Sequence, residues 1–364
     1  MLPLTIFCII CSLSFQYYYF VHPLNSSKVK NNISYLSSDN FKGRLTGTLE
    51  NYETANFIKH YFKTENLSYY DKDYLQSFNV IYPEKTDASP SLMVKDKNGF
   101  IIKQYKYAED YKEDMLNFKN SSVSFKKDDV ISLSENSFQV QTANQYFLFY
   151  TPKNDNLDFR SSFISNSRGS MYIMIKKQTS KEIKNYLNSG YEISCFIPFH
   201  NKLTSAYNVI GYIKGKNPAL PPLVLSAHFD HLGSDLSGTV YSGALDNASG
   251  TSFLLGLIKY INSLGKPERN IVIAAFNAEE FGCLGSKNFA QRYKDTLRGG
   301  KVINFDMLGS DKNVPLSIMA GKWDSKNSSF VKEIAQLCIN SKINFKYTFE
   351  NSSDHQYFRA YNID

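Results

Sequence analysis

The segment PPLVLSAHFDH, Pro221 to His231, decides the fold class of this chain. A short apolar run follows two prolines here and ends at His228, with Asp230 close behind it. Such a run is typical of a strand that is buried on both faces of a parallel sheet. Because open α/β sheets bind ligands at the carboxyl ends of their strands, we expect His228 to lie in a functional site.

Three further motifs bring carboxylates to places where a strand is expected to give way to a loop or a helix. They are GALDNASG (Gly243 to Gly250), NAEEFG (Asn277 to Gly282) and NFDMLG (Asn304 to Gly309). Zinc takes His nitrogen and Asp or Glu oxygen, and a catalytic zinc site leaves a position open for water. One imidazole and three carboxylates from separate strand ends therefore indicate a hydrolytic zinc site.

Two adjacent acids, Glu279 and Glu280, follow the apolar run NIVIAAF, Asn270 to Phe276. Neighbouring side chains on an extended backbone point in opposite directions, so one acid can face a metal while the other faces a water. Most pairs of glutamates are solvated surface residues instead. The position of this pair behind a buried strand favours the site.

Alternation of strand and helix patterns predicts an α/β fold, a three-layer α/β/α sandwich with a mixed, largely parallel sheet. Helices are expected at Glu50 to Asn66 and at Ala248 to Leu264, where apolar residues recur at helical spacing. The expected strands include Tyr207–Ile213, Leu223–His228, Ile271–Phe276, Val302–Met307 and Pro315–Ala320.

The four motifs resemble those of the co-catalytic zinc exopeptidases, which include bacterial leucyl aminopeptidases, glutamate carboxypeptidase II and, as a variant, glutaminyl cyclase. The resemblance extends to LSSDNFKGRLTGT (Leu36 to Thr48), SFNV (Ser77 to Val80) and YNVIGYIKG (Tyr207 to Gly215). It implies two zinc ions and a peptide substrate.

The resemblance also implies a role for each motif residue. The implied metal ligands are His228 for one zinc, Glu280 for the other, Asp246 between the two and Asp306 beside His228. Glu279 is implied as the general base. Asp230 is implied as the group that orients the ring of His228. The peptide bond after the bridging Asp is usually cis in this family, which corresponds here to Asp246–Asn247.

Two more histidines extend the resemblance. His231 matches the second His of an HxDH variant, where it is not usually a metal ligand. His355 lies in SSDHQYF (Ser352 to Phe358), which resembles a motif that borders the active-site cleft, so it is a cleft residue or a substitute ligand. The family's last metal-binding His lies further along, and this sequence reaches Asp364 without a match. We therefore expect a C-terminally incomplete catalytic domain with one zinc rather than two and weakened peptidase activity.

The motifs divide the chain into four parts. Residues 1–21 are apolar and aromatic and predict a signal peptide or an N-terminal anchor, hence an exported protein that is secreted, periplasmic or membrane-anchored. Residues 28–87 are the first part of the peptidase domain, and residues 201–364 are its catalytic part. Between them, residues 88–200 predict a β-rich insertion that resembles a protease-associated lid.

Composition supports an ordered core, since hydrophobic residues make up 42% of the chain and aromatic residues 15%. The formal net charge of +7 is spread along the chain and not gathered in a basic block, so we expect no nucleic-acid partner. Cys195, Cys283 and Cys338 have no disulfide or zinc-finger spacing and are expected to be small buried hydrophobes. The oligomeric state stays open.

Three functions remain in competition. The first is an aminopeptidase-type zinc hydrolase, favoured over a carboxypeptidase because the arginines of the catalytic half are scattered and offer no carboxylate clamp. The second is an inactive relative of such an enzyme. The third is a single-zinc acyltransferase of the glutaminyl-cyclase kind.

Overall fold

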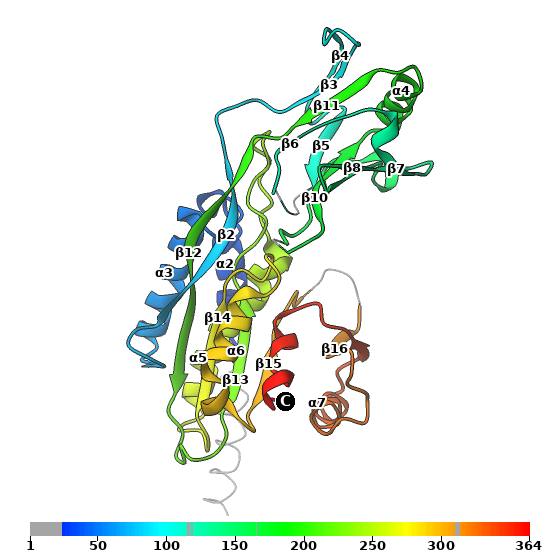
Figure 1. The fold of residues 1–364 in the computed structure, drawn as a ribbon. Coiled ribbons are helices and arrows are strands. Elements are labelled where there is room, and N and C mark those ends of the chain that lie inside the picture. Colours follow the sequence, from blue (N-terminus) through cyan, green and yellow to red (C-terminus); the bar gives the residue numbers. More distant parts are fainter. Residues whose placement is uncertain (1–23, 115–116, 118, 165, 310–313) are drawn as a thin grey trace, which may run out of the picture.

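The computed structural model describes residues 24–114, 117, 119–164, 166–309 and 314–364 (Figure 1). The predicted signal peptide or anchor at residues 1–21 lies outside the described residues. Within the described part of the chain, no helix has the length and apolar character needed to cross a bilayer.

A six-stranded sheet carries the motifs that the sequence analysis singled out. Its members are β1 (Ser68–Tyr69), β2 (Leu75–Lys85), β12 (Phe199–Ile213), β14 (Ile271–Phe276), β13 (Leu223–His228) and β15 (Lys301–Asn304). Strand β13 pairs in parallel with β14 and β15, whereas β12 pairs antiparallel with β14 and β2. The predicted mixed sheet is confirmed, but its parallel part is confined to the three strands that end at the site. Much of the antiparallel part of the sheet is the long pairing of β2 with β12. These two strands are antiparallel because they carry the chain into and out of an insertion.

Helices cover both faces of this sheet, which confirms the three layers. On one face α3 (Leu49–Thr64) and α5 (Gly250–Ser263) pack against residues such as Leu225 and Ile273. On the other face α6 (Leu284–Leu297) packs against Val224 and Val272. Alternate residues of one buried strand therefore serve opposite layers. Helix α2 (Ser26–Leu36) lies beside α5.

Both helices predicted from apolar spacing are present. Helix α3 begins after Thr48, whose side chain accepts a hydrogen bond from the backbone N–H of Asn51. Helix α5 follows a wide helical turn, η4 (Ala244–Ser249), and the peptide bond Asp246–Asn247 in that turn is cis, as the resemblance implied. Asp246 lies in this turn, just ahead of the α5 helix.

The predicted β-rich insertion, lying between β2 and β12, is confirmed (Figure 1, top). One sheet has the order β5 (Tyr111–Asp114), β10 (Gly169–Ile175), β9 (Gln145–Tyr150), β8 (Ser137–Thr142) and β7 (Val130–Leu133). The other has the order β4 (Ile101–Tyr105), β3 (Ser91–Lys95), β11 (Glu192–Phe196) and β6 (Ser122–Phe125). A helix that the sequence analysis did not predict, α4 (Lys177–Asn188), packs on β11. Buried aromatic residues, among them Phe125, Phe138 and Phe149, fill the space between the sheets.

One strand prediction was wrong in its placement. The segment Pro315–Ala320 was expected in the central sheet, but β16 (Leu316–Ala320) pairs with β17 (Phe345–Phe349) in a separate two-stranded sheet. Helix α7 (Ser329–Asn340) covers that pair. At the edge of β15 the backbone of Val302 donates instead to the carbonyl of Asp364 at 2.6 Å. The three cysteines are free and buried, as expected.

Candidate metal centre

Parallel pairing brings the predicted site residues to one edge of the sheet. Strand β13 ends at His228, and Glu279 and Glu280 follow the end of β14. Asp306 lies just after β15, and Asp246 enters from the turn before α5. Four motifs that are up to 78 residues apart in sequence therefore meet because their strands are neighbours in one sheet.

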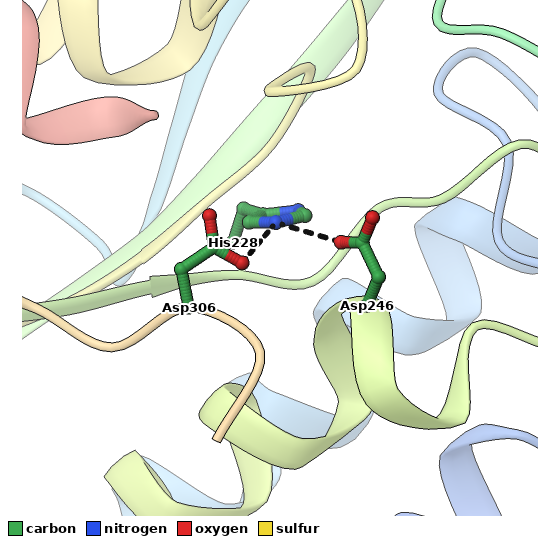
Figure 2. A group of neighbouring side chains, drawn as sticks. All are labelled: His228, Asp246 and Asp306. Atoms are coloured by element: carbon green, nitrogen blue, oxygen red, sulfur yellow. Dashed lines mark ion pairs between the residues drawn. The ribbon is translucent and has the colours of Figure 1, made fainter. Parts of the chain in front are cut away.

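The first cluster of metal-binding groups is His228, Asp246 and Asp306 (Figure 2). The Nε2 atom of His228 lies 3.3 Å from an oxygen of Asp246 and 3.4 Å from an oxygen of Asp306. With zinc–ligand bonds of about 2.0–2.2 Å, the donors of a tetrahedral shell lie about 3.3–3.5 Å apart. The three side chains thus have the spacing that a zinc ion requires.

Buried polar atoms without hydrogen-bond partners also indicate that the first cluster can hold a zinc ion. Among the described residues, neither ring nitrogen of His228 nor Oδ1 of Asp306 has a hydrogen-bond partner, although these atoms are buried. Burial alone would lower the pKa of His228, but the acids around it, Glu279 first, raise this pKa well above its usual value. The surrounding acids therefore favour positive charge at this position, which a protonated ring or a bound divalent cation supplies.

A second cluster consists of His231, Asp246 and Glu280. Its donor atoms all lie within 4.8 Å of one another, and Nδ1 of His231 is 2.8 Å from Oε1 of Glu280. Asp246 belongs to both clusters, which matches its implied position between two metals. The sequence analysis expected Asp246 and Glu280 to stand there without an imidazole, but the structure puts His231 beside them.

Glu279 lies next to both clusters. Burial raises the pKa of its carboxyl well above the usual value, and the neighbouring acids Asp354 and Glu280 raise it further. A carboxylate whose pKa is moved toward neutrality is suited to accept and return a proton. The implied role of Glu279 as a general base is therefore compatible with its surroundings.

Asp230 faces two groups. One of its oxygens lies 3.6 Å from Nδ1 of His228, the ring that it was expected to orient, which is longer than a hydrogen bond. Its carboxylate also accepts hydrogen bonds from the backbone N–H groups of Glu279 at 3.1 Å and Glu280 at 3.2 Å. Asp230 thus fixes the turn that presents the two glutamates.

His355 does not join either cluster. Its Nε2 atom lies 2.9 Å from the backbone carbonyl of Glu350, so the structure does not place it as the substitute ligand. Its neighbour Asp354 is fully buried, and burial raises the pKa of this carboxyl to about 7. The sequence analysis assigned no role to Asp354, although the motif that it quoted contains this residue.

Arg44 is a buried residue that the sequence analysis also passed over. Its guanidinium donates to the carbonyls of Phe229 at 2.8 Å, Ser242 at 2.8 Å and Gly243 at 2.9 Å. Burial lowers its pKa to about 10. Arg44 therefore connects the loop after β13 to the loop that carries Asp246. Arg44 lies in the segment Leu36 to Thr48 that carried the family resemblance, and this position was the only sequence feature that pointed to it.

A pocket of about 570 Å³ opens beside the second cluster. One wall comes from an irregular segment of the insertion, residues 158–164, which we call the strap. The strap is held to the insertion by Asp114, which accepts a 2.6 Å hydrogen bond from the backbone of Ser161. Ser162 of the strap donates to Oε2 of Glu280 at 2.5 Å. The insertion thus reaches the metal centre, a contact that no local pattern in the sequence indicated.

Residues 208–364 match the profile of peptidase family M28. These residues belong to peptidase family M28. The family recognised from the motifs is therefore confirmed. The M28 profile begins within β12 and includes all the predicted metal ligands.

The individual relatives that this chain resembles include aminopeptidases and a membrane protease. Aminopeptidase YwaD of Bacillus subtilis (strain 168) is 27% identical over 223 residues, which is 60% of this chain and 46% of that protein. A vacuolar membrane protease of Meyerozyma guilliermondii is 27% identical over 191 residues, 49% of this chain and 19% of that protein. The chain thus spans less than half the length of these curated relatives. A solved zinc aminopeptidase from Bacillus subtilis shares the fold with a TM-score of 0.59 at 18% identity, covering 94% of this chain and 84% of that one.

Proposed function

We propose that this protein is a zinc-dependent peptidase of the aminopeptidase type. The observation that carries the proposal is the first cluster, in which His228, Asp246 and Asp306 have zinc-shell spacing and unsatisfied buried atoms. Zinc would be held by these three side chains. When bound, zinc polarises a carbonyl and lowers the pKa of water.

Glu279 would act as the general base and acid. Its carboxylate would take a proton from the attacking water and return it to the leaving amine. Asp230 would keep Glu279 in place through the backbone hydrogen bond described above. The buried acids around Glu279, which raise its pKa, would help it to hold that proton between the two transfers.

A free N-terminus is the favoured substrate end. Three acids, Asp158, Asp246 and Glu280, line the pocket against one arginine, Arg160 of the strap, which donates through one terminal nitrogen to the carbonyl of Ser234. The excess of negative charge favours a cationic substrate end over a carboxylate. Dipeptides blocked at either end test this choice. Cleavage of only the N-blocked set would reverse it.

The substitution Glu279→Gln tests the mechanism. We expect turnover to be lost while zinc content is kept, because the amide cannot accept the proton and Glu279 is not a proposed ligand. The half-buried residue Glu65 provides a matched control, since Glu65→Gln removes a carboxylate at the end of α3 that belongs to neither cluster. Activity that survives Glu279→Gln would exclude Glu279 as the base.

The other two functions predict different results. An inactive relative would bind zinc without cleaving any dipeptide. A glutaminyl-cyclase-type enzyme would release ammonia from a peptide with an N-terminal glutamine. We also propose export, on the apolar character of residues 1–15, and cell fractionation of the expressed full chain tests it.

A further inference from the structure

We propose that His231 is the imidazole ligand of a second metal ion, held together with Asp246 and Glu280. The inference rests on the proposed zinc-dependent function but concerns a separate ion. It replaces the expectation that the second position lacks an imidazole. It also assigns a role to a histidine that the resemblance left outside the metal shell.

The geometry of the second cluster is compact. Its three donor groups lie within 4.8 Å of one another, and Asp246 is shared with the first cluster. The shortest contact is the 2.8 Å between Nδ1 of His231 and Oε1 of Glu280. Two donors of one zinc shell lie about 3.3 Å apart, so these atoms need to separate by only about half an ångström. A bound metal would take the place of the hydrogen bond between these two atoms.

The ring of His231 is fixed by its surroundings. The residue is 9% exposed, and its backbone N–H donates to the carbonyl of Arg44. Gly243 lies against the ring, where a Cβ atom would be only 2.6 Å from Cδ2 of His231. Arg44 holds Gly243 in that place through its carbonyl. The glycine therefore leaves just enough room for an imidazole whose Nδ1 faces Glu280.

Glu280 is equally constrained. Its backbone N–H is bound to Asp230, and its Oε2 accepts the hydroxyl of Ser162 from the strap. The remaining oxygen, Oε1, is the one that faces His231. Each carboxylate oxygen thus has one defined partner, and an ion at Oε1 would leave the Ser162 contact in place.

The negative charge around the second cluster also favours binding of a cation. Asp246 and Glu280 are accompanied by the acids of the first cluster and by Glu279. Nitrogen from histidine with oxygen from two carboxylates is a donor set that zinc accepts. The rival imidazole, His355, is bound to the Glu350 carbonyl and lies outside both clusters.

Metal content of the purified full chain tests the inference. After loading with zinc and dialysis, we expect two zinc ions per chain for the wild type and for the control His355→Ala. We expect one for His231→Ala. His231→Asn should also bind one, because an asparagine amide can donate to Glu280 in place of Nδ1 but is a poor zinc ligand. Circular dichroism of each variant checks that the fold is kept.

A second measurement reports the ligand directly. In the cobalt-loaded protein, the ring N–H of each metal-bound imidazole gives a strongly shifted proton resonance. We expect two such signals in the wild type and one in His231→Asn. Loss of the His231 signal together with the second ion would identify His231 as a ligand and not only a positioning group.

Other outcomes overturn the inference. One zinc in the wild type would exclude the second site and leave a single-ion form of the proposed function. Two zincs in His231→Ala would show that another group completes the site. Full recovery of the second ion in His231→Asn would reduce His231 to a hydrogen-bond donor that positions Glu280. A wild type that binds no zinc would refute the proposed function as well.

Discussion

Two buried clusters of charge lie close together in this protein, and they are built in opposite ways. At the junction between the insertion and the peptidase domain, Lys112 of β5 forms an ion pair of 2.7 Å with Asp235, and both side chains are almost fully buried. Lys112 also donates to the hydroxyl of Tyr241, and Asp235 accepts hydrogen bonds from Ser237 and Thr239. In the metal centre, by contrast, carboxylates face one another and two histidines.

The difference explains which cluster is structural. A buried charge is tolerated when it is paired and hydrogen-bonded, and the junction meets that condition with its own side chains. The metal centre does not, because Nε2 of His228 lies 3.3 Å and 3.4 Å from its carboxylate neighbours, against 2.7 Å between Lys112 and Asp235. The junction therefore needs no added ion, whereas the metal centre is arranged to receive one.

The largest expected effect is at the junction. Replacing Lys112 by Met leaves Asp235 buried without its counter-charge, which should lower the free energy of unfolding by about 3–5 kcal/mol. The double variant Lys112→Met/Asp235→Leu should recover most of that loss, because it leaves no buried charge behind. Urea unfolding of the three proteins measures both effects. A single variant as stable as the wild type would remove the contrast between the two clusters.

Zinc should stabilise the wild type by a smaller amount. At a free concentration one hundred times its dissociation constant, an ion that binds only the folded state adds about 2.7 kcal/mol. The gain should be smaller in His228→Ala, which keeps only the ligands of the second cluster, and retained in Lys112→Met, compared with the same variants after chelation. Thermal unfolding with and without zinc provides the measurement. Equal gains in both variants would place zinc elsewhere.

Removing the strap contact should have a more limited effect. Ser162→Ala deletes the hydrogen bond to Glu280, and loss of such a partner typically lowers metal affinity by about 10–100-fold. Competition with a chromophoric chelator should show the loss for the ion bound at Glu280. Ser194→Ala is the matched control, because the hydroxyl of this half-buried serine of the insertion bonds to Ser124 on the neighbouring strand and not to a metal-centre residue. An unchanged affinity would mean that the strap does not hold the glutamate.

The smallest expected effect concerns pH. Burial would raise the pKa of Asp235, but its bonds to Lys112 and Ser237 outweigh burial and hold the pKa below its usual value. A lowered folded-state pKa adds stability above the unfolded-state value of about 3.9 and loses it as pH falls through the folded-state value. The stability advantage of the wild type over Asp235→Asn should therefore be full above about pH 5 and shrink in acid. Urea unfolding at a series of pH values tests the sign, and an advantage that grows in acid would contradict it.

The metal-binding residues could be predicted from the sequence, but the side chains that hold them in place could not. Strand ends and their acids are local patterns, so His228, Asp246, Glu280 and Asp306 could be found from short motifs. The contact between Ser162 and Glu280 joins residues 118 positions apart, and the Lys112–Asp235 pair likewise spans the insertion boundary. Neither serine nor lysine carries a pattern that foretells such a partner.

The same limit applies to the fold and to His231. The apolar runs predicted the strands, but the pairing of β16 with β17 depends on which sheet edge is accessible, and a run of apolar residues does not specify its neighbour. His231 was visible as part of a motif. Its ring direction follows from Gly243 and Arg44, which approach it from other loops, and this could be seen only once the loops were placed.

The strap also determines what would be lost if the insertion were removed from this protein. Lys85 and Phe199 are direct partners in the β2–β12 ladder, so the whole insertion could be excised and the chain rejoined by a short turn at that point. Such a shortened chain would keep its central sheet, yet it would lose one wall of the pocket and the hydroxyl that holds Glu280. Excision would also remove Lys112, the buried partner of Asp235. Swapping the insertion between relatives would therefore exchange part of the metal centre and part of the core along with it.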